Sequence, residues 1–327
     1  EALDAASRAC GLVPGNVSYA GLKAQLELAI GAPERARGTL EAALARSPAS
    51  AMLRFEYASL LERLREPVAA AEAYRQAIRL DPGHGPALSQ LVHLERWTAD
   101  WRELAEHEQR MREGVAAGRA LLSPFVMLAA PSTRAEQRRA AESWSGALAG
   151  APLRARRPLS TGRLRVGYLS ADFHTHATAF LTAGLFEAHD RGRFEIAAYS
   201  IGQDDASPIR QRLVRAFDRF VDLKAAAPEQ VAARIRDDGI DLLVDLKGHT
   251  AGAPPRILAL RPAPLQAHYL GYPGTIGGGL VERQSVYRDP AGQPVDVFVA
   301  FYGLGVTNGA EMINYSNVID SGDLDAV

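Results

Sequence analysis

The stretch "LRVGYLSADFHTHATAF", residues 164–180, joins three kinds of sequence. A short run rich in Leu, Val and Tyr ends just before Asp172, a polar loop follows, and a second apolar run begins near Ala177. The first run has the length and composition of a buried strand, and the second is typical of a helix. The loop holds His174 and His176, which the pattern leaves open as metal ligands, ordinary loop residues or one side of an active site.

The same strand and helix pattern recurs further along the chain. Strands are predicted at residues 164–170, 194–201, 241–247 and 265–271, and helices at 178–188, about 208–217, 229–237 and 254–260. Ser207 and Pro208 form a good helix start, an N-cap hydroxyl followed by a proline in the first turn. Strands that alternate with helices predict right-handed crossovers and a largely parallel sheet covered on both faces.

The loops that follow these strands are "SADFHTH", "SIGQDD", "LKGHTAG" and "LGYPGT". In open α/β sheets, ligands bind at the carboxyl ends of the strands, where these loops lie. Glycine lets a backbone N–H approach a phosphate, and hydroxyl groups donate to it. The loops therefore suit a nucleotide-type ligand, although none of them is a G-x-G-x-x-G or a P-loop.

The first third of the chain repeats with a period of 34 residues. Pro14, Pro48 and Pro82 are spaced by that period. Three other sets of residues have the same spacing: Ala2, Ala36 and Ala70; Ala9, Ala43 and Ala77; Leu40 and Tyr74. This spacing is typical of tetratricopeptide repeats, in which small residues let paired helices approach and proline ends each second helix. We expect repeats over 1–95 and a helical extension over 96–150. Such an array either holds an extended peptide or packs against the next domain.

Composition excludes several classes of protein. The chain has 327 residues, 47% of them hydrophobic and 23% charged, with a formal net charge of −1, as in a globular protein of about two domains. This balance argues against nucleic acid as a partner. Cys10 is the single cysteine, which excludes an internal disulfide and fits a reducing, cytoplasmic setting. No apolar run is long enough to span a membrane, and the arginine-rich stretch 151–162 is predicted to be a basic linker.

Three stretches carry a resemblance to a known family. They are "RLRVGYLSADFHTH", "FEIAAYSIGQDDASPIRQRL" and "RIRDDGIDLLVDLKGHTAGAPPRILALRPAPLQAHYLGYPGT". With the repeats upstream, they resemble the O-linked N-acetylglucosamine transferases, glycosyltransferase family 41, especially the bacterial and Spindly-like members. The resemblance is most specific over residues 163–276. Two positions depart from the family pattern: Lys247 stands where Asn is usual, and Tyr269 where Trp is common.

The resemblance implies a fold and a reaction. The fold would be tetratricopeptide helices followed by one Rossmann-like half of a GT-B glycosyltransferase, at 163–276, and a short β-rich tail at 277–327. The reaction would move a sugar from UDP-N-acetylglucosamine, or from GDP-fucose as in Spindly, to Ser or Thr hydroxyls of acceptor proteins. No metal and no cofactor beyond the donor is expected. Because the second Rossmann half of the family is not recognisable here, we expect the chain as given to be inactive.

The resemblance also points to site residues. The family histidine of D-F-x-x-H falls on His176, the predicted catalytic residue, which weakens the metal interpretation of the histidine pair. Predicted donor-binding residues lie in two loops: His249, Thr250, Gly271, Tyr272, Pro273, Gly274 and Thr275. His249 could equally cap backbone, and the turn at 271–275 could equally pack at a hinge. Asp172 is expected to cap its loop or orient His176, whereas Asp241 and Asp245 are expected to make structural pairs.

The tail has a different character. "VYRDPAGQPVDVFVAFY" predicts a β-hairpin, and the region weakly resembles exosortase-associated exopolysaccharide proteins. Two alternatives to an O-glycosyltransferase therefore stay open. One is a non-catalytic, peptide-binding scaffold, and the other is a fusion or misassembly with an exopolysaccharide-export protein.

Overall fold

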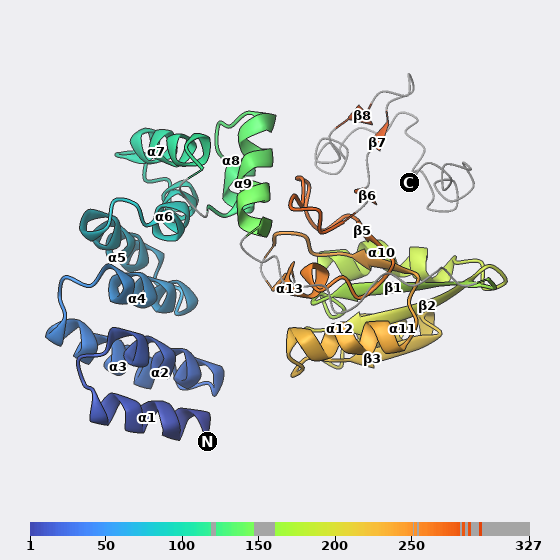
Figure 1. Cartoon of the computed structure of the whole chain (residues 1–327), viewed down its shortest axis with the longest axis horizontal. Helices are drawn as coiled ribbons and strands as arrows, with labels where there is room; N and C mark the ends of the chain where they lie inside the picture. The colour runs from blue at the N-terminus through green and yellow to red at the C-terminus, as the bar shows by residue number, and fades with distance from the viewer. Residues whose placement is uncertain are drawn as a thin grey trace. The chain divides into compact units, whose positions relative to one another are not determined.

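The computed structural model describes residues 1–118, 122–146, 161–250, 252–253, 255–281, 283–284, 287–288 and 294–295. The chain divides into two compact units, Glu1–Trp144 and Ser145–Val327. The predicted basic linker, 151–162, falls almost wholly outside the described residues. The first unit is helical and the second is built on a sheet (Figure 1).

The helical unit begins with three pairs of helices. Their bounds are α1 Ala2–Leu12, α2 Val17–Ala29, α3 Pro33–Arg46, α4 Ala51–Arg63, α5 Pro67–Leu80 and α6 Gly85–Trp97. Neighbours along the chain pack on one another, and the short turns between them make the neighbours antiparallel (Figure 1). The unit continues with α7 Leu104–Ala116, α8 Pro124–Ala129 and α9 Arg134–Gly146. The predicted tetratricopeptide-like helix pairs are confirmed, whereas the boundary at residue 95 stays a prediction.

The phased residues occupy the positions that the repeat predicts. Alanines at 36, 70 and 77 have no exposed surface, and Leu40 and Tyr74 are equally buried. Each phased proline follows the end of a helix by two residues, after α1, α3 and α5. Ala2 is exposed and Ala9 only half-buried, because α1 packs mainly on α2. Small side chains at 36, 70 and 77 thus allow the close helix contacts expected of such repeats.

The second unit is built on a parallel sheet. Its strands are β1 Leu164–Ser170, β2 Phe194–Ser200, β3 Arg219–Asp222, β4 Leu242–Asp245, β5 Leu265–His268 and β6 Arg283–Gln284. Their order is β3-β2-β1-β4-β5-β6, and every neighbouring pair is parallel. This is the strand order of the doubly wound dinucleotide-binding fold. The predicted parallel sheet is confirmed.

Two strands were not predicted. The sequence pattern indicates two helices in succession between 194–201 and 241–247, and β3 lies between them. With four residues, only one of them buried, β3 gives too weak a pattern to recognise. The sixth strand, β6, pairs with β5 inside the region expected to be a divergent tail. The sheet therefore continues beyond residue 276.

Helices cover both faces of this sheet. They are α10 Ala177–Glu187, α11 Pro208–Ala216, α12 Pro228–Asp237 and α13 Pro255–Ala259. One face packs on α10 and α11 through alternate residues of the central strands, among them Val166, Tyr168, Ile196 and Val244. The last five residues of β1 and of β2 are all buried, so both faces of these strands are covered and their sequences are continuous apolar runs.

Little of the tail is described. Residues Tyr287–Arg288 form β7, which pairs antiparallel with β8 at Pro294–Val295. This antiparallel pairing agrees with the hairpin that "VYRDPAGQPVDVFVAFY" predicts, and the rest of that stretch lies outside the described residues. Within the described residues, no helix has both the length and the hydropathy to cross a membrane.

Candidate functional site

The strand order determines where a ligand would bind. Strand β1 is followed by a crossover toward β2, whereas β4 and β5 lie on the other side of β1. From β1 the chain adds strands toward one edge of the sheet, and from β4 it adds them toward the other edge. The loops after β1 and β4 therefore lead to opposite faces of the sheet. A crevice forms at the carboxyl ends of the strands at such a switch point. The loops in question are "SADFHTH" and "LKGHTAG", both singled out from the sequence.

The loop after β1 ends in the N-cap of α10. That cap is His176, whose Nδ1 accepts a hydrogen bond from the Thr178 backbone N–H at 3.2 Å. The His176 side chain keeps 42% of its surface exposed. The ring of His174 lies 5.8 Å from that of His176, centroid to centroid. A half-exposed imidazole thus stands at a helix N-terminus, where the helix dipole favours an anion.

Asp172 and Lys247 form a buried ion pair across the switch point. The Lys247 ammonium donates to Asp172 Oδ1 at 2.9 Å and to Oδ2 at 2.7 Å. Both side chains are less than one-tenth exposed. Asp172 Oδ2 also lies 3.6 Å from His176 Nδ1, which is beyond hydrogen-bond distance. Asp172 therefore lies between a lysine that it binds and a histidine that it only approaches.

A second contact joins the loops after β1 and β2. Asp205 Oδ2 accepts from the backbone N–H of Thr175 at 2.9 Å and from its hydroxyl at 2.6 Å. These hydrogen bonds, with those from Ser207, hold the pKa of Asp205 well below its usual range. The residue before His176 is consequently anchored to the neighbouring loop, which limits the freedom of the histidine.

The loop after β4 holds His249 and Thr250, both predicted to contact the donor. His249 is buried, and its Nε2 lies 2.8 Å from the Ile276 carbonyl oxygen. Its Nδ1 is buried without a hydrogen-bond partner, and burial lowers the pKa of the imidazole. The Thr250 hydroxyl donates to the Lys247 carbonyl at 2.9 Å. Both side chains make structural contacts here, and their donor-binding role stays a prediction.

The turn at 271–275 is tightly packed. A Cβ on Gly271 would lie 1.8 Å from the Leu246 carbonyl oxygen, and one on Gly274 would lie 2.6 Å from the Tyr272 hydroxyl. Tyr272 is buried, which raises the pKa of its phenol, and its ring meets that of His249 edge to face. Pro273 and Thr275 are half-buried. Close packing explains these glycines, so their presence alone does not indicate a ligand.

Asp241, just before β4, and Asp245, its last residue, make the structural contacts that were expected. Asp241 Oδ2 accepts from the Arg165 N–H at 2.9 Å, at the amino end of β1. Asp245 is fully buried and accepts from the backbone N–H groups of Lys247 and Gly248. It also contacts His268 Nδ1 at 3.0 Å, which links β4 to β5.

Three participants were not predicted from the sequence: Asp205, His268 and the pairing of Lys247 with Asp172. Lys247 was noted only as a departure from the family pattern, and Asp205 only as part of the loop "SIGQDD". The paired residues lie 75 positions apart. Only the order of the strands brings them together, and no local pattern reports that order.

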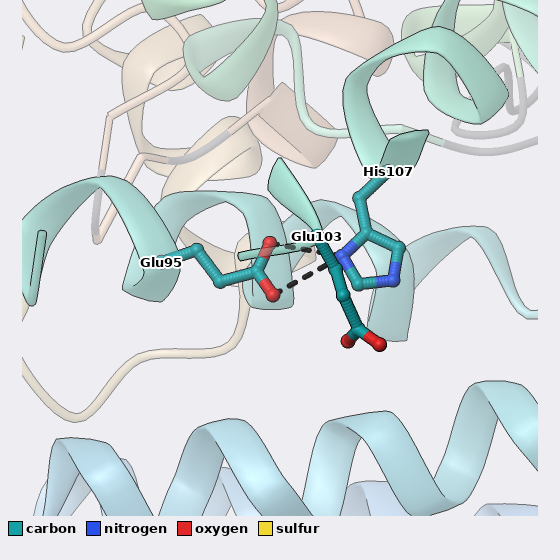
Figure 2. Close-up of side chains that lie close together, drawn as sticks. All are labelled: Glu95, Glu103 and His107. Carbon is teal, nitrogen blue, oxygen red and sulfur yellow. Dashed lines mark hydrogen bonds and ion pairs between the residues drawn. The ribbon is translucent and has the colours of Figure 1, made fainter. Parts of the chain in front are cut away.

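In the described part of the chain, three side chains lie close enough to share a metal ion. These are Glu95, Glu103 and His107 of the helical unit (Figure 2). His107 Nδ1 lies 2.9 Å from Glu95 Oε2. However, the guanidinium of Arg75 already donates to Glu95 at 2.8 Å and lies 3.3 Å from Glu103. A fixed cation thus occupies the acidic cluster, which makes it an ion-pair network.

The helical unit also has a cavity of about 200 Å³, lined in part by Val115, Arg139 and Glu142. Ligand pockets usually measure about 300–1,000 Å³. It lies between α7 and α9, among residues that no motif singles out. The candidate residues singled out from the sequence lie instead at the carboxyl edge of the sheet.

Comparisons with known proteins bear on the family of the second unit. Residues 150–301 match the model of glycosyl transferase family 41. The chain is 37% identical over 120 residues to a probable UDP-N-acetylglucosamine–peptide N-acetylglucosaminyltransferase, SEC, of Arabidopsis thaliana. It is 37% identical over 140 residues to the corresponding Caenorhabditis elegans enzyme, and 32% over 117 residues to a SPINDLY protein of Arabidopsis thaliana. The three alignments cover 37%, 42% and 35% of this chain, but only 12–13% of each relative.

A solved structure supports the fold. The chain matches a mutant O-GlcNAc transferase of Thermobaculum terrenum with a TM-score of 0.60 and 22% identity, over 84% of this chain and 55% of that one. The family match runs to residue 301, beyond residue 276 where the resemblance was expected to end. Residues 150–301 therefore match glycosyl transferase family 41, and the relatives named above are UDP-N-acetylglucosamine–peptide N-acetylglucosaminyltransferases.

Proposed function

We propose that this chain provides one wall of a protein O-glycosyltransferase site, which transfers N-acetylglucosamine from UDP-N-acetylglucosamine to Ser or Thr hydroxyls. The observation that carries the proposal is the position of His176. It caps α10 beside the switch point of the sheet, inside the segment that matches the family. A cytoplasmic location and acceptor proteins bound along the tetratricopeptide helices belong to the same proposal.

The geometry suits a diphosphate donor. Beyond the Thr178 N–H, which His176 caps, the first turn of α10 has backbone N–H groups without an intrahelical partner, and it carries a partial positive charge. His176 adds an exposed imidazole at the same point. Together they can stabilise negative charge on a phosphate oxygen or orient an acceptor hydroxyl. Such a group is worth typically about 10²–10⁴-fold in rate.

The chain as it stands is proposed to be inactive on its own. Family resemblance implies that a second Rossmann half forms the other wall, and the chain spans about an eighth of the length of its curated relatives. A donor bound to one wall stays solvated and loosely placed. Because misplacement by about 1 Å can cost about 10²-fold, one wall should not support measurable transfer.

The test uses a chimaera in which residues 1–284, through β6, are followed by the second half of a relative. Radiolabelled UDP-N-acetylglucosamine and GDP-fucose are offered as alternative donors, with an acceptor peptide. We expect incorporation from the first, lowered about 10²-fold or more in kcat/KM by His176→Ala and less than about tenfold by His174→Ala. Equal losses for both variants, or activity that a chelator removes and zinc restores, would reject His176 as the functional histidine.

The non-catalytic scaffold is the runner-up. Among the described residues, no contact favours a peptide-binding scaffold over an O-glycosyltransferase. Incorporation of label by the chimaera, together with loss in the His176→Ala variant, would exclude it, whereas peptide binding by the chimaera without transfer would support it.

A further inference from the structure

The ion pair of Lys247 with Asp172 has a consequence for the chemistry of His176. A neutral imidazole carries its proton on one nitrogen, and the partner of the other nitrogen decides which. Two partners compete for Nδ1 of His176. The Thr178 N–H, at 3.2 Å, needs Nδ1 as an acceptor, whereas the Asp172 carboxylate, at 3.6 Å, would need Nδ1–H as a donor.

A free carboxylate would win this competition. Hydrogen bonds to an ionised group are roughly twice as strong as those between neutral groups. Asp172 would therefore draw the proton to Nδ1 and leave Nε2 with a lone pair, the state of a general base. The observed geometry is different, because Nδ1 caps α10 and lies too far from Asp172 for a hydrogen bond.

Lys247 accounts for the difference. Its ammonium contacts both oxygens of Asp172, at 2.9 and 2.7 Å, and both side chains are buried. The positive charge offsets the carboxylate and reduces its attraction for a second donor. Asp205, on the adjacent loop, is similarly engaged by Thr175. No other carboxylate in the described residues is paired with His176.

We propose that Lys247 sets the tautomer of His176. By holding both oxygens of Asp172, it leaves Nδ1 to the helix cap and keeps the imidazole proton on Nε2. Nε2 makes no hydrogen bond to the described residues, so its N–H is free for a ligand. Lys247 is thus a positioning residue that acts through Asp172.

The tautomer determines whether Nε2 of His176 donates or accepts a hydrogen bond during transfer, an inference that rests on the proposed function. An Nε2–H can donate to a phosphate oxygen or to another oxygen that gains negative charge during transfer. It cannot accept the proton of a Ser or Thr hydroxyl at the same atom. His176 would therefore stabilise developing negative charge and would not act as the general base at Nε2.

The test is nitrogen NMR of the intact chain with ¹⁵N-labelled histidine, at a mildly alkaline pH where an ordinary imidazole is neutral. The His176 signals are those that His176→Gln removes. Protonated and unprotonated ring nitrogens differ widely in chemical shift, so the tautomer is read directly. We expect a protonated Nε2 and an unprotonated Nδ1. A protonated Nδ1 in the unaltered chain overturns the proposal.

Variants test the role of the lysine. Lys247→Asn should move most of the proton to Nδ1, because Asp172 loses its cation. The double variant Lys247→Asn/Asp172→Asn should return the proton to Nε2. Lys224→Asn, which removes an exposed lysine, is the matched control and should change nothing. A folded Lys247→Asn variant with the proton still on Nε2 overturns the role of Lys247.

Loss of a buried cation can prevent folding, and Lys247→Gln is then measured instead. It keeps a hydrogen-bond donor on a side chain one bond shorter but removes the charge, and a retained Nε2–H there overturns the proposal in the same way. These spectra need no transfer activity. A failure of the proposed transferase function therefore leaves the tautomer result intact, and the reverse also holds.

Discussion

The Nε2 atom of His249 lies 2.8 Å from the carbonyl oxygen of Ile276, 27 residues further along the chain. This contact ties the loop after β4 to the segment that follows the turn at 271–275. Because a carbonyl only accepts, Nε2 must carry the proton, and Nδ1 is left as the buried atom without a partner. His249 was predicted to bind the donor, and its burial gives it a structural role whether or not it does so.

The first prediction follows from this contact. His249→Ala removes the hydrogen bond and leaves a cavity beside the ring of Tyr272, which should lower the free energy of unfolding by about 2 kcal/mol. His249→Gln offers an amide N–H in place of Nε2–H and should lose less. Urea denaturation followed by circular dichroism measures both. Equal losses would show that the donated hydrogen bond contributes little.

A second prediction concerns pH. Burial lowers the pKa of His249 and of His189 below the ordinary value of about 6.5. The unfolded chain therefore binds these protons at a higher pH than the folded chain, and stability falls as pH drops from about 6.5 toward the folded pKa values. The contribution is fully present above about pH 6.5. Urea midpoints at about pH 7.5 and about pH 5.5 should show the loss.

The control for this pH effect is the double variant His249→Gln/His189→Gln, which cannot take up these protons. Its urea midpoint should depend less on pH over the same range. An unchanged slope would assign the effect to other groups. Carboxylates such as Asp205, whose pKa is lowered, titrate in a more acidic range and do not confuse the comparison.

The third prediction tests the close packing at Gly271. A Cβ at this position would lie 1.8 Å from the Leu246 carbonyl oxygen, so Gly271→Ala must shift backbone and should cost about 1–3 kcal/mol or more. Gly184, on the exposed side of α10, has open space where a Cβ would lie, with no neighbouring heavy atom within 4 Å. Gly184→Ala should stabilise the helix by about 0.5–1 kcal/mol. Thermal unfolding of both variants checks the contrast, and a neutral Gly271→Ala would contradict it.

Local patterns predicted much of this fold. The bounds of β1 agree with the predicted run at 164–170, because polar or glycine-containing sequence flanks this apolar run on both sides. The repeat of 34 residues placed the helix pairs, since small side chains recur where the helices touch. By contrast, β3 escaped detection because only Val221 of its four residues is buried.

The site was less predictable than the elements that hold it. His176 was identified through a motif, but its role as N-cap and its distance from Asp172 depend on the path of the loop. The pairing of Asp172 with Lys247 depends on β1 lying next to β4, although two strands separate them in the sequence. Contacts of this kind arise from strand order, which neither composition nor periodicity reports.

The last prediction concerns Arg75 and the acidic cluster of the helical unit. Glu95, drawn with Glu103 and His107 in Figure 2, has no exposed surface. Arg75 donates to Glu95 at 2.8 Å and to Asp100 at 2.7 Å. Removing one partner of a buried pair leaves an uncompensated charge, which typically costs about 3–5 kcal/mol. Arg75→Met should therefore destabilise the chain by about that amount. Arg79→Met, which breaks an exposed pair with Glu72, should cost less than about 1 kcal/mol.

The same variants decide between an ion-pair network and a metal site. If Arg75 is the resident cation, zinc or a chelator should leave the melting temperature of the unaltered chain unchanged. In the Arg75→Met variant the acidic side chains lose their cation, and added zinc should then recover part of the stability through Glu95, Glu103 and His107. Stabilisation of the unaltered chain by zinc, reversed by a chelator, would instead show that the cluster binds a metal with Arg75 in place.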